Sequence, residues 1–446
     1  MKGNLLYYSI VVALAGFLFG FDTVVISGAD EQLQLLWSSS SLFHGFVVMS
    51  MALWGTVVGA LFGHIPTDKI GRKKTLIWIG VLYTISAIGS AVVSDPFLFS
   101  FFRFVGGLGV GASTIAAPAY VTEIAPKESR GKLVALYQFN IVFGILIAFI
   151  SNYLLKDIGD SSWRWMIGVE AIPAIIYTIM VFGIPNSPRW LILHKGDKVA
   201  AKKVFQLIGV GQNEKQLDDV ISAIQLEAQE AEARKESIIQ PKFRLPVMLA
   251  FLIAFFNQVS GINAVLYYAP RIMAEAGLDK SVALLSSIGI GVTNMVCTLA
   301  GLYLIDRLGR KMLMYIGSIG YIFSLSMVAV AFFAGWQGMA VPIFLFIFIG
   351  AHAIGQGTVI WVFISEIFPN HLRAKGQSFG SSTHWVLAAL ITVFMPPLLS
   401  NAENPGYVFV FFSFMMVLQL VWVKVMMPET KGVSLEDLQA QLVKQD

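Results

Sequence analysis

The sequence is poor in charge and almost free of cysteine. Only 13% of its 446 residues are Asp, Glu, Lys or Arg, whereas 56% are hydrophobic, and the mean hydropathy is +0.72. This composition excludes an ordinary soluble domain. The single cysteine, Cys297, excludes an internal disulfide and gives no information on the cellular compartment. No Asn-x-Ser/Thr acceptor for glycosylation occurs.

Motifs of catalysis are missing as well. The sequence contains no P-loop, no cluster of metal ligands and no nucleophile motif, so we expect no cofactor, no metal and no enzyme. The Gly-x-Gly-x-Gly run at 107–111 resembles a dinucleotide loop, but it lies inside an apolar run with no strand before it. Close helix packing is the better interpretation, and Gly55, Gly59 and Gly63 predict a similar face of small residues.

Long hydrophobic runs fill most of the chain. A bilayer core needs about 20 apolar residues per helix. The runs that meet this length predict an all-α membrane protein whose spans are 6–28, 43–63, 75–94, 98–122, 132–155, 165–184, 246–270, 282–305, 312–334, 341–365, 377–400 and 406–427. The first run is too long for a cleaved signal peptide, and no Ala-x-Ala site follows it.

Basic residues are distributed unevenly between the two sides of this membrane. If the N-terminus is cytoplasmic, 26 of the 31 Lys and Arg lie on the cytoplasmic side and Arg103 lies inside a span. The remaining four lie in outer turns: Lys156, Arg164, Arg271 and Lys280. This bias follows the positive-inside rule. We therefore expect both termini to be cytoplasmic, in a plasma membrane or a bacterial inner membrane, with the lipid bilayer as a partner.

One long polar insert divides the spans into six and six. It holds ten basic and eight acidic residues, with helical patterning at 197–208 and 214–236. We interpret it as a solvated set of short helices, because no dense basic cluster favours nucleic acid or anionic lipid. The predicted regions are an N-terminal bundle (1–185), the insert (186–244), a C-terminal bundle (245–428) and a tail (429–446).

Two loop motifs occur once in each half. Asp68-Lys-Ile-Gly-Arg72 corresponds to Asp306-Arg-Leu-Gly-Arg310, and the segment from Glu123 to Arg130 corresponds to that from Glu366 to Arg373, at offsets of 238 and 243 residues. Two repeated bundles that meet at a central cavity form a transporter architecture. Such charges at helix ends predict ion pairs that hold the bundles closed and part on opening. Capping of the helices by the two aspartates is the alternative.

Residues 254–270 are unusually polar for a membrane span. Three amides and two phenols lie in it: Asn257, Gln258, Asn263, Tyr267 and Tyr268. Unpaired amides in hydrocarbon cost several kcal/mol each. On a straight helix Gln258 and Asn263 would lie roughly 140° apart. They can face one cavity only if the helix breaks, and Ser260-Gly261 is where glycine permits a break. Broken helices form the substrate sites of many transporters, and these side chains suit a sugar.

Together these motifs resemble the sugar porter family of the major facilitator superfamily. Besides the loop repeats, the resemblance rests on the segment Asn257-Gln-Val-Ser-Gly-Ile-Asn263, on Pro185-Asn-Ser-Pro-Arg189 and on Pro428-Glu-Thr-Lys-Gly432, and it covers nearly the whole chain. The short first outer turn and the absence of a glycosylation acceptor bring the chain closer to bacterial proton–sugar symporters than to animal facilitative glucose transporters.

The resemblance implies a monosaccharide site built from both halves. Its residues are Phe19, Gln138, Asn257, Gln258, Asn263, a gating Tyr267, Asn294, Trp361, His384 and Trp385. Amides both donate to and accept from hydroxyls, and aromatic faces cover the C–H face of a pyranose. Taken singly, each amide has a helix–helix clamp as its alternative role. The resemblance also adds Arg189 and Glu429 to the cytoplasmic gating residues.

Asp22 and Arg103 are ionisable residues within apolar spans, which is a functional hypothesis by default. The resemblance implies that symporters carry an aspartate at position 22 where facilitators commonly carry asparagine, so the pair suggests proton coupling. A static buried ion pair is the alternative. We expect Glu123 to belong to the gating loops or to meet Arg103, and Glu170 to be interfacial.

Four features depart from the family pattern. Asn257 replaces a longer glutamine, and Asn186 replaces an acidic residue. His384 replaces an amide and adds a group that can titrate near neutral pH, unless it is packed between helices. Ala353 and Gln356 alter the span that contains the binding tryptophan, which affects the choice between hexose and pentose.

We therefore expect a secondary transporter that imports a monosaccharide with a proton by alternating access. A small-molecule sugar and a proton are its expected partners, and nucleic acid is not. A facilitative uniporter of the same fold is the first alternative. A membrane sugar sensor is the second, although the tail from Pro428 to Asp446 is short for a signalling segment.

Overall fold

The computed structural model describes residues 3–126, 130–211, 213–233, 236–369, 371–433 and 435–443. Within these ranges every regular element is a helix. Twelve helical spans in the described residues are long and apolar enough to cross a membrane. The predicted all-α membrane fold is confirmed.

The elements of the N-terminal half are α1 (Gly3–Val25), η1 (Ile26–Gly28), α2 (Asp30–Leu36), α3 (Ser41–Phe43), the π-helical η2 (His44–Met49), α4 (Met51–Phe62), α5 (His64–Lys69), α6 (Arg72–Val92), α7 (Pro96–Ile124), α8 (Arg130–Leu155), α9 (Ser162–Gly168) and α10 (Ala171–Phe182). The insert contains α11 (Pro188–Trp190), η3 (Leu191–Lys195), α12 (Lys198–Ile208), α13 (Glu214–Ala233) and η4 (Pro241–Phe243). The C-terminal half contains α14 (Arg244–Val259), α15 (Ile262–Glu275), α16 (Lys280–Leu308), α17 (Arg310–Phe333), α18 (Ala340–Ile354), α19 (Gln356–Ile367), α20 (Arg373–Asn401), α21 (Gly406–Val425) and α22 (Leu435–Leu442).

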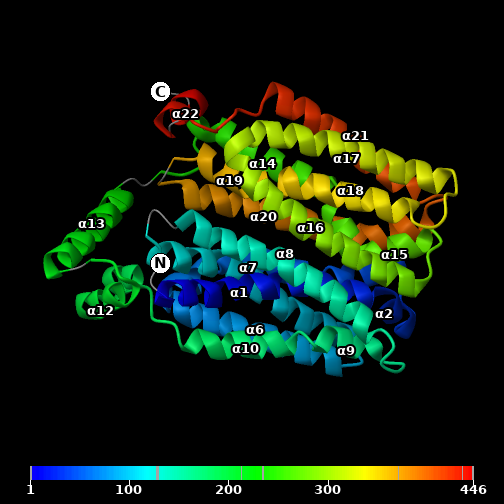
Figure 1. Ribbon diagram of the computed structural model, residues 1–446, viewed down its shortest axis with the longest axis horizontal. Helices are drawn as coiled ribbons and strands as arrows, with labels where there is room; N and C mark the ends of the chain where they lie inside the picture. Colours follow the sequence, from blue (N-terminus) through cyan, green and yellow to red (C-terminus); the bar gives the residue numbers. More distant parts are fainter. Residues whose placement is uncertain are drawn as a thin grey trace.

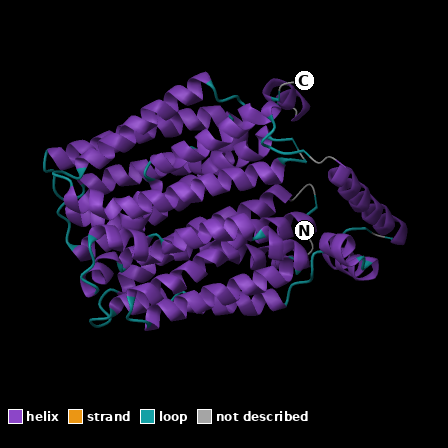
Figure 2. Ribbon diagram, turned by 180° about the vertical axis from the view of Figure 1, so that it is seen from behind, coloured by secondary structure: helices purple, strands orange, loops and turns teal. Residues whose placement is uncertain are grey.

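The two halves form two bundles that lie side by side (Figure 1). Helices α12, α13 and α22 gather at one end, where both ends of the chain also lie, and the view from behind shows the same arrangement (Figure 2). We call this end the insert end and the other the opposite end.

Glycines let helices of one bundle approach closely. The Cα of Gly55 on α4 faces the carbonyl of Phe104 on α7, and Gly107 faces the carbonyl of Ala52, so that a Cβ at either glycine would overlap backbone. Small residues allow such contacts in membranes, where lipid gives helices no hydrophobic reason to associate. Both glycine runs are therefore packing faces, as predicted.

The seventh span is broken where the sequence predicts it. Helix α14 ends at Val259 and α15 begins at Ile262. Between them Gly261 has a φ of +85°, a left-handed conformation that favours glycine. A Cβ there would lie 2.6 Å from the ring of Phe412. A second break, which was not predicted, separates α18 from α19 at Gly355 (φ −86°, ψ −101°).

The insert is amphipathic rather than wholly solvated. Asp197 caps α12 by accepting a hydrogen bond from the backbone N–H of Ala200 (2.9 Å). One face of α12, which includes Val204 and Phe205, is buried in the hydrophobic core of the N-terminal bundle. Both predicted insert helices form, with α13 ending at Ala233.

Each repeated loop motif forms an ion-pair set at the insert end. Arg72 lies 2.9 Å from Glu123 and 3.2 Å from Asp68. In the second half Arg310 lies 2.7 Å from Glu366 and 3.3 Å from Asp306. Each set joins helices of a single bundle, so in this conformation these ion pairs do not bridge the two bundles. Glu123 is paired here and does not meet Arg103.

A hydroxyl completes each set. Ser187 donates to the second oxygen of Glu123, and Thr430 donates to that of Glu366 (2.6 Å). The predicted residue Arg189 pairs with Glu227 of α13 (3.1 Å). The Nε of Arg373 is buried without a hydrogen-bond partner among the described residues. The side chain of Arg130 lies outside the described part of the chain.

Glu429 is a helix cap rather than the partner of an ion pair. Its carboxylate accepts hydrogen bonds from the backbone N–H groups of Arg310, Lys311, Thr430 and Lys431, at 2.9 to 3.0 Å. Two of these groups begin α17, where the helix dipole favours an anion. Partial burial acts to raise the pKa of Glu429, but the backbone hydrogen bonds outweigh it and hold the pKa below its ordinary value.

We predict that Glu429→Gln lowers the free energy of unfolding by about 1 kcal/mol at neutral pH, because a neutral amide caps less well. Since the folded pKa is lowered, the carboxylate stabilises the fold fully above the unfolded pKa. Its contribution is lost as the pH falls through the folded pKa.

Thermal unfolding of wild type and variant in detergent, between pH 7 and the most acidic pH the fold tolerates, should show the difference shrinking on acidification. Glu403→Gln, at an exposed acid of the opposite end, is the control and should change little. A difference that does not vary with pH would contradict the capping role.

Candidate functional site

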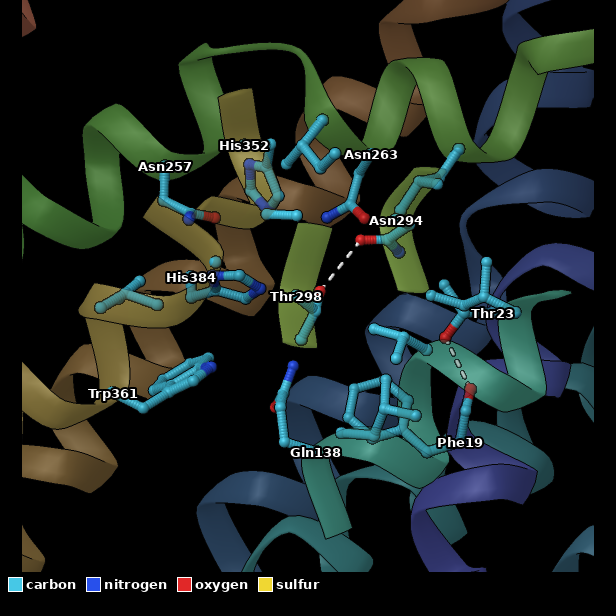
Figure 3. Close-up of a pocket in the computed structure, with 18 of the residues that line it drawn as sticks. Phe19, Thr23, Gln138, Asn257, Asn263, Asn294, Thr298, His352, Trp361 and His384 are labelled. Atoms are coloured by element: carbon cyan, nitrogen blue, oxygen red, sulfur yellow. Dashed lines mark hydrogen bonds between the residues drawn. The ribbon is translucent and has the colours of Figure 1, made fainter. Parts of the chain in front are cut away.

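A cavity lies between the two bundles (Figure 3). The N-terminal bundle supplies Phe19 and Thr23 from α1 and Gln138 from α8, and the C-terminal bundle supplies most of the polar groups. The cavity has a volume of about 120 Å³ and opens to solvent on part of its boundary. None of the described residues that line it is Asp, Glu, Lys or Arg.

The structure brings together nine of the ten predicted site residues. These are Phe19, Gln138, Asn257, Gln258, Asn263, Asn294, Trp361, His384 and Trp385. Tyr267 does not line the cavity, because its side chain is packed among helices and only 1% exposed. It lies instead close enough to Asp22 and Arg103 to interact with both charges.

Three polar residues of the lining were not predicted: Thr23, Thr298 and His352. Thr298 follows Asn294 by one helical turn and donates to its side chain (3.5 Å), so helical periodicity is a signal for it. Thr23 likewise follows Phe19 by one helical turn, so the same periodicity is a signal for Thr23. His352 lies 2.5 Å from the hydroxyl of Tyr321, and no motif in the sequence identifies it.

The amides around the helix break are joined by hydrogen bonds. Gln258 donates to Asn257 (2.9 Å), and Asn263 donates to Gln258 (2.8 Å). Gln258 and Asn263 lie on either side of Gly261, so the break lets both face the cavity. Asn257 in turn donates to Gln356 (3.2 Å), which is fully buried.

His384 lies against the amide of Gln258. The amide nitrogen of Gln258 lies 3.1 and 3.2 Å from its two ring nitrogens. An amide N–H donates, so an unprotonated ring nitrogen can accept from it. The ring of His384 also packs against Trp361 and Trp385, with centroids 5.1 and 4.7 Å apart.

Aromatic rings form the other wall of the cavity. Phe19 of the N-terminal bundle meets Trp385 of the C-terminal bundle at a centroid distance of 5.5 Å. Uncharged donors and acceptors opposite aromatic faces suit a neutral ligand with many hydroxyls and an apolar C–H face. Among the described residues no cluster of His, Cys, Asp and Glu is fit to hold a metal ion.

A charged set is buried beside the cavity. Arg103 of α7 lies 2.5 Å from the Asp22 carboxylate and also donates to the Asp22 carbonyl (3.1 Å). Asp22 is on α1, between the cavity residues Phe19 and Thr23. The guanidinium is fully buried and its Nε has no hydrogen-bond partner among the described residues. The predicted pair is therefore formed.

Glu170 belongs to this set, and the prediction that it is interfacial is wrong. It lies between α9 and α10, is 1% exposed and interacts electrostatically with both Asp22 and Arg103. Its carboxyl group lies close to that of Asp22. Its flanking residues are apolar, and hydropathy alone does not separate a glutamate at a helix end from one inside a bundle.

Polar contacts join the two bundles at the opposite end. Asp30 lies 2.7 Å from His44 of its own bundle and 3.5 Å from Arg271 of α15, with all three side chains buried. Arg271 was predicted to lie in an outer turn, and this is wrong, because it lies inside α15 and is buried. Glu31 and Lys280 pair across the same boundary (2.7 Å), and the hydroxyls of Ser41 and Ser400 are 2.8 Å apart. This end is closed.

Known proteins resemble the chain over nearly all of its length. The family described as "Sugar (and other) transporter" matches residues 8–442. The glucose transporter GlcP of Staphylococcus epidermidis is 34% identical, over 99% of this chain and 98% of its own. The D-xylose-proton symporter of Escherichia coli is 30% identical, over 97% of this chain and 94% of its own.

A solved structure is similar as well. The xylose transporter XylE from E. coli, in a partially occluded inward-open conformation, matches with a TM-score of 0.86 at 29% identity. The match covers 97% of this chain and 100% of that chain.

We predict that Ser41→Cys with Ser400→Cys, in a Cys297→Ser background, forms a disulfide under mild oxidation, because the two hydroxyls are in contact. Mass tagging of free thiols should show both cysteines lost, and a reductant should restore them. Ser41→Cys with Ser382→Cys, whose second site is nearer the insert end of α20, should keep both thiols. Equal cross-linking of the two pairs would contradict the closed end.

Proposed function

Because the chain belongs to the sugar (and other) transporter family, we propose that this multi-pass membrane protein imports a hexose or pentose with a proton by alternating access. The observation that carries the proposal is the cavity, where neutral amides from a broken helix face aromatic rings. Relatives named for glucose and for D-xylose with a proton support this substrate class.

The amides and rings divide the recognition of a sugar between them. Each sugar hydroxyl both donates and accepts, which matches the amides of Gln138, Gln258, Asn263 and Asn294. The indole of Trp361 offers an apolar face to ring C–H groups. The absence of charge among the described lining residues disfavours sugar phosphates and sugar acids.

The charged set provides a proton site. The carboxyl group of Asp22 pairs with the guanidinium of Arg103, and that of Glu170 lies close enough to interact with both. With both carboxyls ionised the buried set carries one net negative charge, and one proton neutralises it. Protonation of Asp22 frees Arg103 to move toward Glu170. Since Asp22 lies within one turn of Phe19 and Thr23, this change alters the α1 wall of the cavity.

Alternating access would use the two ends of the molecule in turn. We infer that the insert end is cytoplasmic, from the excess of Lys and Arg there, and that the opposite end faces outward. The described contacts close the outer end, which agrees with the similarity to an inward-open transporter. We infer that 1–185 and 245–428 rock as two units. In the outward-open state the insert-end charges would gate the other side.

A uniporter of the same fold is the second candidate. The observation that favours it is the complete burial of the Asp22–Arg103 pair, since a static ion pair would look the same in one conformation. Whether Asp22 exchanges its proton during the cycle separates the two.

We predict that a proton gradient drives uphill sugar uptake into proteoliposomes, and that Asp22→Asn abolishes accumulation but keeps sugar exchange. An asparagine cannot carry the proton, yet it retains the shape of the site. Glucose, xylose, galactose, arabinose and fructose would be screened as radiolabelled substrates. Equal, gradient-independent equilibration by both proteins would establish a uniporter. Disulfide formation between Ser41→Cys and Ser400→Cys should stop uptake reversibly.

We predict that alanine at Gln258, Asn263 or Trp361 weakens sugar binding by about tenfold to a hundredfold, since each loses hydrogen bonds or a ring contact worth 1 to 3 kcal/mol. Binding to purified, folded variants would be measured by tryptophan quenching or by radioligand competition. Ser382→Ala, at a partly buried residue of α20 outside the cavity, is the control. Unchanged affinity in all three variants would remove this cavity as the sugar site.

A further inference from the structure

A row of buried amides runs from the cavity to the far side of the C-terminal bundle. It starts at Asn263 and passes through Gln258, Asn257, Gln356 and Gln419 to Ser318. These residues come from α15, α14, α19, α21 and α17. The last two, Gln419 and Ser318, are fully buried and do not line the cavity.

The hydrogen bonds of the row all run in the same direction, which Ser318 at its end determines. Ser318 has one hydroxyl proton and donates it to the carbonyl of Met314 (2.7 Å). Toward Gln419 its oxygen can therefore only accept, and it does so from Nε2 at 2.8 Å. The carbonyl of Gln419 then points the other way and accepts from Gln356 Nε2 (2.5 Å).

The same order continues to the cavity. Gln356 accepts from Asn257 (3.2 Å), Asn257 accepts from Gln258 (2.9 Å), and Gln258 accepts from Asn263 (2.8 Å). Every amide thus turns its NH₂ group toward Ser318 and its carbonyl toward the cavity. The carbonyl oxygen of Asn263 is the free end, with no hydrogen bond to a described residue.

We propose that Ser318 and Gln419 are positioning residues that fix this direction, so that Asn263 Oδ1 meets the sugar as an acceptor. This rests on the proposed function, because it assigns the polarity of one contact in the sugar site. Reversing one amide alone would set donor against donor and carbonyl against carbonyl on its two sides. The amides therefore hold their orientation together.

The helix breaks make the row possible. Gly355 ends α18, so Gln356 begins a new helix and reaches both Asn257 and Gln419. Gln356 is one of the positions at which the sequence departs from the family pattern. The row therefore connects that departure with the selection of the sugar.

The test removes the hydroxyl of Ser318 and measures whether Asn263 then offers the sugar a donor or an acceptor. In Ser318→Ala the NH₂ group of Gln419 loses its acceptor, and either direction of the row then leaves one group unpaired. Asn263 should present NH₂ as well as its carbonyl. Ser324→Ala is the matched control, because Ser324 is buried on the same helix and donates to the Gly320 carbonyl (2.7 Å), but accepts from no amide among the described residues.

The probes are the best-bound sugar of the uptake screen and its monodeoxyfluoro analogues, tested on full-length protein in detergent. Fluorine accepts weakly but cannot donate, so one fluorinated position should cost wild type about tenfold in affinity. In Ser318→Ala the loss of affinity caused by this fluorine should be at least threefold smaller than in wild type. In Ser324→Ala it should be the same as in wild type. Gln419→Met breaks the same row at the next residue and should repeat the result if Ser318→Ala does not fold.

Two results would overturn the inference. One is an unchanged pattern of fluorine costs in variants that fold and bind the parent sugar. The other is an equal change in Ser324→Ala, which would indicate general loosening of the bundle. A wild type that binds no sugar would instead refute the proposed function, and the inference with it.

Discussion

Hydrocarbon offers no hydrogen-bond partners, so the polar side chains of the twelve spans must find partners inside the protein. Three groups of them are the amide row beside the cavity, the charged set around Arg103, and the cluster of Asp30, His44 and Arg271 at the opposite end. Each place joins helices that are far apart in the sequence. The helix breaks and glycine faces follow from this, because only a broken or closely packed helix brings these groups within reach of one another.

Helix α15 takes part in all three places. Asn263 lines the cavity, Tyr267 lies beside Asp22 and Arg103, and Arg271 reaches Asp30. The three residues are spaced by four, so they follow one face of the helix with a kink at Tyr268. Asn263, which faces the cavity, and Arg271, which joins the bundles at the opposite end, therefore lie on the same short helix. Gly261, with its φ of +85°, lets α15 take a different direction from α14.

The sequence predicts features that depend on local patterns. The spans follow from hydropathy, the two ion-pair sets follow from repetition of Asp68 and Asp306, and the break at Gly261 follows from two amides on opposite sides of an ideal helix. Features that depend on tertiary contacts cannot be predicted from such local patterns. Glu170 lies between two helices and Arg271 lies inside α15, and the burial of each is decided by the neighbouring bundle or helix. Glu429 caps a helix more than a hundred residues earlier in the chain, and no spacing rule links the two.

The two repeats have the same ion-pair sets at the insert end, but their membrane-spanning parts contain different functional residues. The acidic residues beside Arg103 lie in the N-terminal bundle, and the amide row lies in the C-terminal bundle. Coupling of a proton to a sugar must therefore cross the boundary between the bundles. Near the site the contacts that do so are Phe19 against Trp385, α1 against α15 and, more extensively, α8 against α16. Because α1 carries Asp22 between two cavity residues, a change in its charge state and a change in the cavity wall occur on the same helical turn.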